Sequence, residues 1–377
     1  MTQLVALGGG HSHAIALSLL GQRPMPNLRL TLISDVEQTP YSGMLPGLVA
    51  GFYRYEEVHI DLPPLARFAG AEFVGDRVVG LDLDNRRVFC RDRAPVEFDY
   101  LSINIGSTPA ASVAGAGEYT TPVKPVPQFL RAWEQIEREV EGNRDRPLRL
   151  GIVGGGVGGV ELALNMQANL HRRLVKARRP LDDVEFHLFH RDECLAPGHN
   201  NWVQRRLEKI ARDRGIQVYL SETVAEITRT FVRCESGLTV NCDRVFWVVQ
   251  ASPPPWIKTC GLATDERGFV LVDATLRSVS HPYIFAAGDI ATVQDCPRPK
   301  AGVFAVRQGK PLLENWRRAV EGQVLKSYIP QKQYLALIGT GDRNAIASWS
   351  CVGWQSPLLW QWKDRIDRAF MRRFSNF

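Results

Sequence analysis

The sequence predicts an α/β fold built from two similar units, each with a parallel sheet. Apolar runs that read as strands alternate with segments that read as helices, and these runs cover residues 4–7, 28–34, 100–106, 148–154, 184–190, 244–250 and 283–288. Near-continuous apolar strands indicate parallel sheets whose two faces are covered by helices. An internal repeat indicates the two units, because LVALGGGHSHAIAL at 4–17 is echoed by LGIVGGGVGGVELAL at 150–164.

Composition sets the class of protein. The chain of 377 residues is 45% hydrophobic, which is enough for two packed domains and a tail. Every apolar run is broken before the roughly 20 residues of a spanning helix, and the first residues lack the basic leader of a secretory signal. We therefore expect a cytoplasmic location. The net charge of +6 is modest, and basic and aromatic residues do not interleave as in single-strand binders, so nucleic acid is not an expected partner.

Seven cysteines are scattered along the chain without any Cys-x-x-Cys spacing. An odd number without close pairs argues against a disulfide framework, a zinc site and a redox-active disulfide. We expect no metal in this protein.

The second copy of the repeat carries a G-x-G-x-x-G motif, formed by Gly154, Gly156 and Gly159. In a Rossmann-like dinucleotide-binding fold, the first glycine makes the tight turn, the second lets the backbone approach a pyrophosphate, and the third lets the helix pack on the strand. The phosphate then lies at the helix N-terminus, where free N–H groups favour negative charge. We therefore predict a nicotinamide dinucleotide site, to which Glu161 in the first helical turn also belongs.

The strand after this turn ends in His190 and Arg191, where nicotinamide dinucleotide sites usually carry an acid that binds the ribose. Cationic side chains at this place could accept a 2′-phosphate, so NADPH is expected at least as strongly as NADH. The alternative is that Asp192 or Glu193 takes the usual role of the acid.

The first copy reads Gly8-x-Gly10-x-x-His13, with a histidine where the third glycine is expected. The helix must then pack slightly more widely, or the histidine must turn outward. A metal site is a poor alternative, because rings two residues apart on a loop entering a helix point apart, and no Cys, Asp or Glu follows nearby. We predict a second phosphate-binding turn, with a ribose at the end of the next strand; the predicted contacts are Gly8, Gly9, Gly10, His11, Ser12, His13, Ser34 and Asp35.

Two further motifs narrow the class of protein. DYLSINIGSTP at 99–109 and HPYIFAAGDIA at 281–291 resemble the strand motifs that approach the flavin in flavoproteins with two dinucleotide-binding domains. On these residues the chain resembles the pyridine nucleotide-disulfide oxidoreductase superfamily, and within it type II NADH dehydrogenases and the flavoprotein domain fused in front of selenide, water dikinase. TPYSGMLPGLVAGFY at 39–53, KAGVFAVRQG at 300–309 and the tail fit the second group.

The resemblance implies FAD in the first unit, NADH or NADPH in the second, and a second unit inserted into the first. The implied FAD-binding domain comprises residues 1–115 and 268–330, the NAD(P)-binding domain residues 145–265, and a small C-terminal region residues 331–377. Asp289 would bond a ribityl hydroxyl of the flavin. The other implied FAD contacts are Ser42, Val78, Gly106 and Lys300.

Lys124 and Gln308 are the candidates for a catalytic role beside the flavin, and no acid or base is assigned. The implied function is an FAD-dependent NAD(P)H oxidoreductase that passes electrons to a quinone-like acceptor without a redox-active disulfide. The segment at 301–309 keeps Gln308 but has Val303 and Arg307 at other positions where the helix beside the flavin in type II dehydrogenases presents glutamines, which weakens the expectation of a quinone as acceptor. Two alternatives stay open: a flavoprotein reductase in selenium or sulfur metabolism, favoured by a cysteine such as Cys194 or Cys351 near the flavin, and a flavin-bearing assembly or scaffold factor on a membrane complex.

The tail is expected to form short strands within 334–350 and then an amphipathic helix over 357–374. One stripe of this helix carries Leu359, Trp362, Ile366, Phe370 and Phe374. The stripe could lie on a lipid surface at the cytoplasmic face of a membrane, pack on the flavin domain, or bind a partner protein. A homodimer also stays open.

Overall fold

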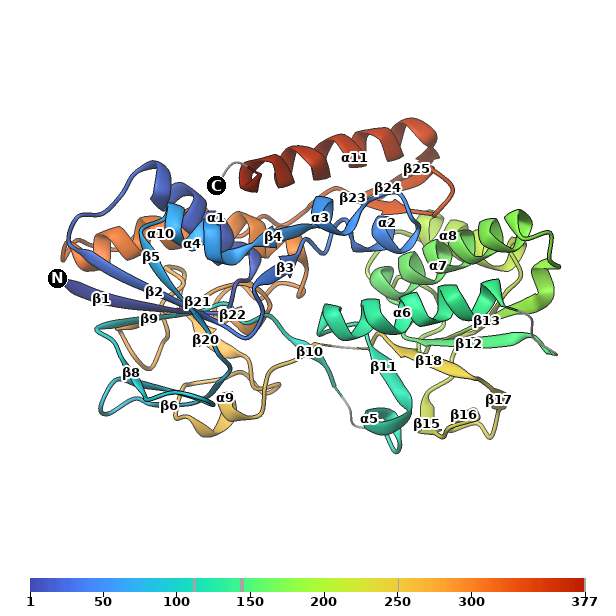
Figure 1. The fold of residues 1–377 in the computed structure, drawn as a ribbon, viewed down its shortest axis with the longest axis horizontal. Coiled ribbons are helices and arrows are strands. Elements are labelled where there is room, and N and C mark those ends of the chain that lie inside the picture. Colours follow the sequence, from blue (N-terminus) through green and yellow to red (C-terminus); the bar gives the residue numbers. More distant parts are fainter. Residues whose placement is uncertain (111–112, 143–145, 250, 376–377) are drawn as a thin grey trace.

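The structure is a computed structural model that describes residues 1–110, 113–142, 146–249 and 251–375. It confirms the predicted α/β fold. Two five-stranded sheets, each parallel throughout, lie in the two halves of the molecule (Figure 1).

The first sheet has the strand order β21-β9-β1-β2-β5. In that order its strands are Ile284–Ala286, Tyr100–Ile103, Thr2–Leu7, Leu28–Ser34 and Ala71–Gly75. β1 pairs with β2 in the register Leu7↔Ile33, so both strands end at the same edge of the sheet. The four strands other than β5 are largely buried, as their continuous apolar sequences predict.

The second sheet repeats this arrangement with the order β11-β18-β12-β13-β14. Its strands are Thr120–Pro122, Arg244–Trp247, Leu148–Val153, Val184–Phe189 and Ile216–Tyr219. β12 pairs with β13 in the register Val153↔Phe189, which corresponds to the β1–β2 pairing. The strand that leads into a glycine turn is therefore the central strand of each sheet.

The second unit is inserted into the first, as predicted, because β21 of the first sheet follows all strands of the second sheet along the chain. The two connecting segments run side by side, since β10 (Thr108–Pro109) pairs antiparallel with β19 (Ala251–Ser252). The predicted domain limits are not fixed by this pairing and stay a prediction.

Helices cover the sheets, and the two helices that follow the glycine turns are α1 and α7. α1 packs on α10 and α4, and α7 packs on α6 and α2. The longer helices are α1 (His11–Gln22), α4 (Leu62–Phe68), α6 (Val126–Glu141), α7 (Val157–Lys176), α8 (Asn201–Asp213) and α10 (Gly302–Val320). The shorter ones are α2 (Leu45–Val49), α3 (Tyr55–Val58), α5 (Ala116–Tyr119), α9 (Trp256–Thr259), and the 3-10 turns η1 (Leu181–Asp183), η2 (Gly288–Ile290) and η3 (Arg372–Phe374).

Several small antiparallel ladders lie beside the main sheets and were not predicted from the sequence. Their strands are short and carry exposed polar residues, so no clear periodicity marks them. They are β3 (Gln38–Pro40) with β4 (His59–Asp61), β6 (Val78–Asp82) with β7 (Arg87–Cys90) and β8 (Val96–Glu97), and β15 (Val224–Ile227) with β16 (Phe231–Cys234) and β17 (Thr239–Asn241). A further pair, β20 (Val270–Val272) with β22 (Ala291–Val293), is parallel.

The C-terminal region forms a three-stranded antiparallel sheet and a helix, in agreement with the predicted strands and helix. The elements are β23 (Ala336–Gly339), β24 (Ala345–Trp349), β25 (Val352–Ser356) and α11 (Pro357–Met371). α11 lies along the top of Figure 1 and contacts α3 and β24.

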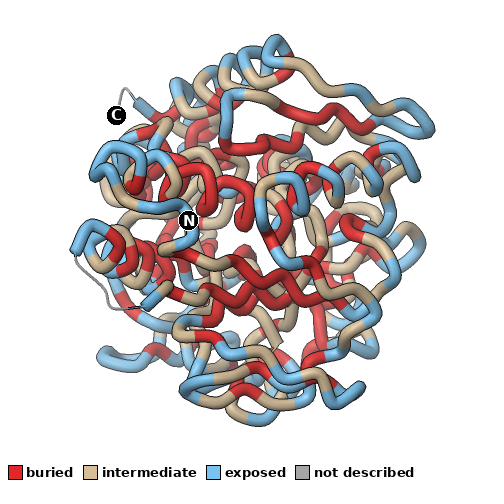
Figure 2. The backbone as a smooth tube through the Cα atoms, turned by 90° about the vertical axis from the view of Figure 1, so that its right-hand side faces the viewer, coloured by how far each residue is buried: buried red, intermediate tan, exposed pale blue. Residues whose placement is uncertain are grey.

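The buried residues form two large apolar clusters, one around each main sheet. Figure 2 shows buried strand segments at the centre of the molecule and exposed segments on the surrounding helices and loops. Within the described ranges, no helix is both long enough and apolar enough to cross a membrane.

Candidate functional site

The first glycine turn joins β1 to α1 and packs against Asn104 at the end of β9. Gly8 has a φ of +84°, and a Cβ there would lie 2.6 Å from the Asn104 carbonyl oxygen. A Cβ on Gly10 would lie 2.4 Å from the Asn104 side-chain oxygen. The backbone N–H groups of His11 and Ser12, at the start of α1, have no hydrogen-bond partner among the described residues. Two N–H groups therefore remain available for an anion at this helix N-terminus.

His13 occupies the third position of the motif and is completely buried, so the outward alternative is wrong. Its Nδ1 lies 2.7 Å from the Gly8 carbonyl oxygen, and its Nε2 lies 2.8 Å from the Ser102 hydroxyl oxygen. A carbonyl can only accept, so Nδ1 carries the proton and Nε2 accepts from Ser102. Burial lowers the pKa of His13 to about 4, which keeps the ring neutral at pH 7.

His11, the first residue of α1, lies edge-on to the stacked rings of Tyr41 and Phe370, with ring centroids 5.5 and 6.2 Å away. Burial, followed by the nearby Lys124 ammonium, lowers the pKa of His11 to about 4. Its Nε2 is buried and has no hydrogen-bond partner in the described part of the chain. A neutral imidazole with an unused buried nitrogen is ready to bond a ligand at this turn.

Asp289 in η2 lies near the same turn, close enough to His11 for the two side chains to interact electrostatically. Lys124 Nζ donates to Asp289 Oδ2 at 3.0 Å, and the Ser107 hydroxyl donates to the same oxygen at 3.2 Å. Burial opposes the charged carboxylate, but the Lys124 charge and the two hydrogen bonds outweigh it, so the pKa of Asp289 lies below its ordinary value. Lys124 comes from the chain before α6 in the second unit, so this ion pair joins the two units.

A recess beside η2 brings Asp289, Lys300 and Gln308 together. Gln308 is buried in α10 and accepts the Gly288 N–H at 2.6 Å, so it holds the turn that carries Asp289. The Lys300 ammonium donates to the Ala291 carbonyl at 2.6 Å and to Thr292 Oγ1 at 2.9 Å. Burial lowers the pKa of Lys300 to about 8.

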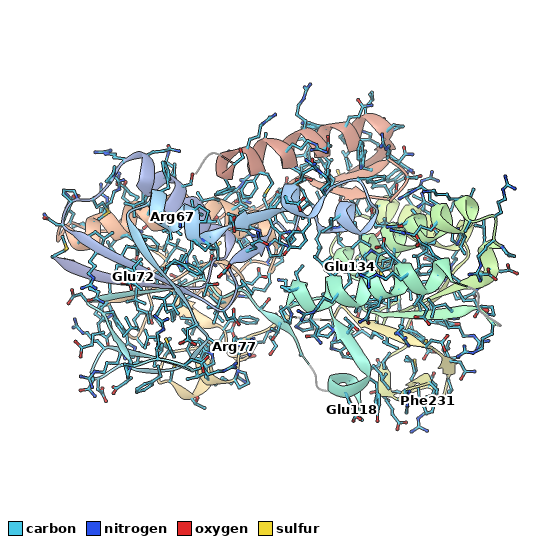
Figure 3. The ribbon with its side chains drawn as sticks, viewed as in Figure 1. Arg67, Glu72, Arg77, Glu118, Glu134 and Phe231 are labelled. Atoms are coloured by element: carbon cyan, nitrogen blue, oxygen red, sulfur yellow. The ribbon has the colours of Figure 1, made fainter. Side chains whose placement is uncertain are left out.

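The carboxyl edge of the first sheet collects three more predicted residues. The Ser34 hydroxyl donates to the Val36 carbonyl at 2.8 Å. Asp35 pairs with Arg77, which Figure 3 labels, at 3.0 Å between Oδ2 and Nε. Val78 follows Arg77 at the start of β6, so Ser34, Asp35 and Val78 lie close together.

Gly106 and Ser42, two implied FAD contacts, lie near the recess, whereas Glu161, which was predicted for the nicotinamide site, contacts β23. Gly106 has a φ of +69°, and a Cβ there would meet nothing within 4 Å. Ser42 is exposed next to the start of α10, where its Oγ would lie 3.0 Å from a Cβ on Gly302. Glu161 accepts the Gly339 N–H of β23 at 2.7 Å, and burial raises the pKa of its carboxyl to about 7.

The second glycine turn has the three features that its motif predicts. Gly154 has a φ of +120°, and a Cβ there would lie 2.3 Å from the Val248 carbonyl oxygen. A Cβ on Gly159 would lie 1.8 Å from the Gly154 carbonyl oxygen, whereas a Cβ on Gly156 would meet nothing within 4 Å. The backbone N–H groups of Val157, Gly158 and Gly159 have no partner among the described residues. Space and donors for a phosphate are both present at the start of α7.

His190 supports this turn rather than offering a positive charge. Its Nδ1 accepts the Gly155 N–H at 3.1 Å, so the ring is held as a neutral imidazole. Burial lowers the pKa of His190 below its ordinary value, although Asp192, 3.2 Å from Nε2, opposes the shift. The expectation of a cationic His190 is therefore wrong, and Arg191 is the exposed cation beside Asp192.

The seven cysteines are all free thiols. Cys351 is exposed at the β24–β25 turn, and Cys194 is partly exposed after β13 in the second unit. Neither lines the recess around Asp289. Among the described residues, no group of three or more His, Cys, Asp or Glu side chains could hold a metal ion.

α11 packs on the protein's own loops at the first turn. Phe370 stacks on Tyr41 with ring centroids 4.3 Å apart. Lys363 Nζ donates to the Gly43 carbonyl at 2.5 Å and to Asp367 Oδ2 at 2.7 Å. Arg368 pairs with Glu57 of α3 at 2.6 Å. The helix thus covers segment 39–53, a loop that contains the short helix α2.

Three residues of this site were not singled out from the sequence: Asn104, Ser102 and Tyr41. Asn104 is nearly completely buried, donates to the Ala287 carbonyl at 2.6 Å and accepts the His13 N–H at 3.2 Å. The one available signal was the pair of polar residues inside the apolar run YLSINIG. Buried polar side chains in a strand usually have assigned partners, which could have marked Ser102 and Asn104.

Comparison with known proteins gives matches over most of the chain at low identity. Ferroptosis suppressor protein 1 of Xenopus tropicalis is 22% identical over 351 residues, covering 87% of this chain and 83% of that protein. Demethylphylloquinone reductase NdbB of Synechocystis is 24% identical over 304 residues, covering 78% and 72%. The crystal structure of the sulfide:quinone oxidoreductase of Aquifex aeolicus superposes with a TM-score of 0.82 at 20% identity, covering 100% of this chain and 92% of that one, which shows a shared fold.

A family model gives the decisive match. The model described as pyridine nucleotide-disulphide oxidoreductase matches residues 2–321, which is most of the chain and includes both glycine turns. The predicted resemblance is thereby confirmed, and the chain belongs to the pyridine nucleotide-disulphide oxidoreductase family.

Proposed function

We propose that the protein is an FAD-dependent NAD(P)H oxidoreductase that reduces a quinone-like acceptor without a redox-active disulfide. The observation that carries the proposal is the presence of two glycine turns with free helix-terminal N–H groups in one chain of this family. Two of its relatives are named a demethylphylloquinone reductase and a sulfide-quinone reductase, which supports a quinone-like acceptor. The cysteines, which are all free thiols and show no Cys-x-x-Cys spacing, support electron transfer that does not pass through a disulfide.

The first turn fits an FAD. Gly8, Gly10 and the start of α1 would hold the pyrophosphate, and His11 offers a buried, unused Nε2 beside it. Asp289 would bond a ribityl hydroxyl, while Lys124 supplies positive charge next to it. FAD, when bound, supplies the chemistry of accepting hydride from NAD(P)H and passing electrons to the acceptor. The role of the protein here is binding, orientation and electrostatics.

The second turn fits a nicotinamide dinucleotide, because Gly156 leaves open space in front of three free N–H groups. The neutral His190 cannot attract a 2′-phosphate, and the Asp192 carboxylate lies beside it. We therefore infer a preference for NADH over NADPH. Asp192→Asn should lower the NADH preference, measured as the ratio of kcat/KM for the two coenzymes, by about tenfold. An unchanged ratio in that variant would reject Asp192 as the source of the preference.

The proposed reaction is tested by mixing the FAD-loaded protein with NADH or NADPH without oxygen and following the flavin absorbance. The structure offers a matched pair of variants, because a Cβ on either Gly156 or Gly117 meets nothing within 4 Å. Gly156→Asp places a carboxylate where a pyrophosphate would lie and should slow reduction at least about tenfold. Gly117→Asp, on α5, adds the same charge elsewhere and should react as the wild type. Absence of reduction by both coenzymes in the wild type would reject the function and favour the assembly-factor alternative.

The outer face of α11 supports peripheral membrane contact. Its inner face is docked on the protein, but Leu358, Trp362 and Ile366 are 70%, 46% and 44% exposed at helical spacing. Trp349 and Trp354 on the adjoining hairpin are also exposed. Exposed tryptophans beside basic residues suit a lipid interface, so we propose that this face lies on a membrane.

A liposome flotation assay tests this membrane contact. The double variant Leu358→Glu, Trp362→Glu should stay in the soluble fraction, whereas Val175→Glu, which changes an exposed apolar residue of α7, should float as the wild type does. Equal flotation of all three proteins would reject the lipid contact. If the double variant had half the molecular mass in solution of the wild type, this face would instead be assigned to a homodimer interface.

A further inference from the structure

A second recess, separate from both glycine turns, lies at the far end of α7. It has a volume of about 860 Å³, solvent at its mouth included, and its walls carry three arginines and one carboxylate. We propose that this recess is a binding site for a phosphate group. The site is about 20 Å from the start of α7, by the helical rise from Gly158 to Arg172, so it does not depend on the function proposed above.

The three arginines come from three parts of the chain that meet at this recess. Arg172, on the last turns of α7, donates to the carbonyls of Gly341 and Ala50. Arg214, which follows α8, donates to the Thr340 carbonyl and pairs with Asp342. Arg343 lies in the turn between β23 and β24. The fold therefore fixes two guanidinium groups by backbone contacts and sets a third beside them.

Charge in the recess is unbalanced. Asp342 is the one carboxylate among its lining residues and is paired with Arg214, so two positive charges have no counter-ion in the lining. Burial first, and the Arg343 charge second, lower the pKa of Arg172. Arg343 itself has no hydrogen bond or ion pair within the described ranges. An anion bound here would offset the repulsion between the positive charges of Arg172 and Arg343.

Aromatic rings hold the two uncompensated guanidinium groups in position. Arg172 lies over the Phe52 ring at 5.3 Å, and Arg343 lies 5.5 Å from the rings of both Phe52 and Trp360. Two N–H groups of Arg172 already donate to the Gly341 and Ala50 carbonyls, whereas stacking leaves the edges of the Arg343 guanidinium group free. Free guanidinium edges form paired N–H···O bonds with phosphate oxygens. Because the side chains are already ordered, binding would cost little additional side-chain entropy.

The same phosphate chemistry could come from a soluble phosphorylated metabolite or from a lipid headgroup. Trp360 connects the recess to α11, whose opposite face exposes Leu358, Trp362 and Ile366. The experiment therefore needs one arm with soluble phosphates and another with vesicles.

The test uses the FAD-loaded protein with saturating NAD⁺, so that phosphate cannot occupy the glycine turns. Arg343→Gln removes one charge and loses no hydrogen bond of the described structure, and Arg131→Gln, at an exposed position of α6, is the charge-matched control. In the soluble arm, calorimetry measures binding of inorganic phosphate and glycerol 3-phosphate. In the vesicle arm, sedimentation compares phosphatidylcholine vesicles with and without phosphatidate.

In at least one arm, we expect Arg343→Gln to bind about tenfold more weakly than the wild type and Arg131→Gln. Loss in calorimetry identifies a soluble ligand, and loss confined to phosphatidate vesicles identifies a headgroup. Equal binding by all three proteins in both arms would overturn the proposal. The flavin spectrum and the rate of flavin reduction by NADH should be the same in the three proteins, which separates this site from the proposed reaction.

Discussion

The two glycine turns reach similar backbone geometry by different means. In the second turn, Gly159 lets α7 approach so closely that a Cβ would lie 1.8 Å from the Gly154 carbonyl oxygen. In the first turn, the corresponding carbonyl, that of Gly8, instead accepts a hydrogen bond from His13 Nδ1 at 2.7 Å. The strand on the far side differs as well, since Val248 packs on Gly154 but Asn104 packs on Gly8 and also bonds the His13 N–H.

This difference shows that the third glycine of the motif can be replaced when polar partners are built around its substitute. His13 is bulky, but Ser102 on the sheet and the Gly8 carbonyl satisfy its two ring nitrogens. The first turn is therefore held by a buried polar network, and the second by close packing of backbone on backbone. Each turn should respond to a different kind of perturbation.

The largest effect is expected from Gly159→Ala in the second turn. The new methyl group would overlap the Gly154 carbonyl, so α7 must move away from the turn, at a cost of about 3 kcal/mol or more in the free energy of unfolding. Reduction by NADH should fall with it, while bound FAD should remain. Urea unfolding and flavin reduction kinetics measure the two effects.

Gly158→Ala is the matched control, because a Cβ on Gly158 meets nothing within 4 Å. It adds the same methyl group in the same helical turn and should gain up to about 1 kcal/mol from helix propensity. Equal behaviour of the two variants would contradict the close packing that distinguishes the second turn.

A smaller effect is expected from His13→Gly, which converts the first turn to the conventional motif. The change removes two buried hydrogen bonds and leaves the Ser102 hydroxyl without its partner, so unfolding should become easier by about 2 to 3 kcal/mol. We expect FAD to stay bound, because the helix-terminal N–H groups are unchanged. Loss of the flavin from a folded variant, seen in its absorbance spectrum, would show that His13 itself holds the cofactor. His13→Gln, whose amide can reach one of the two partners, should recover part of the stability.

Much of the fold could be predicted from the sequence, and part of the site could not. The central strands and both glycine turns were recognisable because buried parallel strands are continuously apolar and phosphate turns need glycine. The small ladders were missed because strands such as β6 and β15 are short and half-exposed. Asp289, Lys300 and Gln308, which were each predicted to lie beside the flavin, line one recess, but the motifs did not show that the Gln308 side chain accepts the Gly288 N–H.

Two expectations were wrong because a sequence motif shows which residue type stands at a position but not which groups that residue contacts in the fold. His190 was expected to be a cation at the end of its strand, but the Gly155 N–H takes its Nδ1 and burial keeps it neutral. The stripe on α11 was expected to face one way, yet Phe370 is buried while Trp362 and Ile366 are exposed. The inner face of this helix packs on the protein itself, and the outer face is the one left for a lipid surface or a partner protein.

The smallest effect, and the one most specific to the first turn, is a dependence of stability on pH. Burial lowers the pKa of His13 to about 4 in the folded protein, whereas an unfolded chain has a histidine pKa near 6.5. Below pH 6.5 the unfolded state therefore binds the proton more readily, and stability decreases as the pH falls toward 4; above 6.5 the contribution is complete. Near pH 5 the loss should be about 2 kcal/mol for this residue. His11, with its pKa also lowered to about 4, should add to it. Urea unfolding of the wild type and of His13→Gln between pH 4 and 7 gives the free energy of unfolding as a function of pH. The variant should show a smaller decrease at low pH, because the contribution of His13 is absent. Parallel curves for the two proteins would show that the ring is not buried in its neutral form.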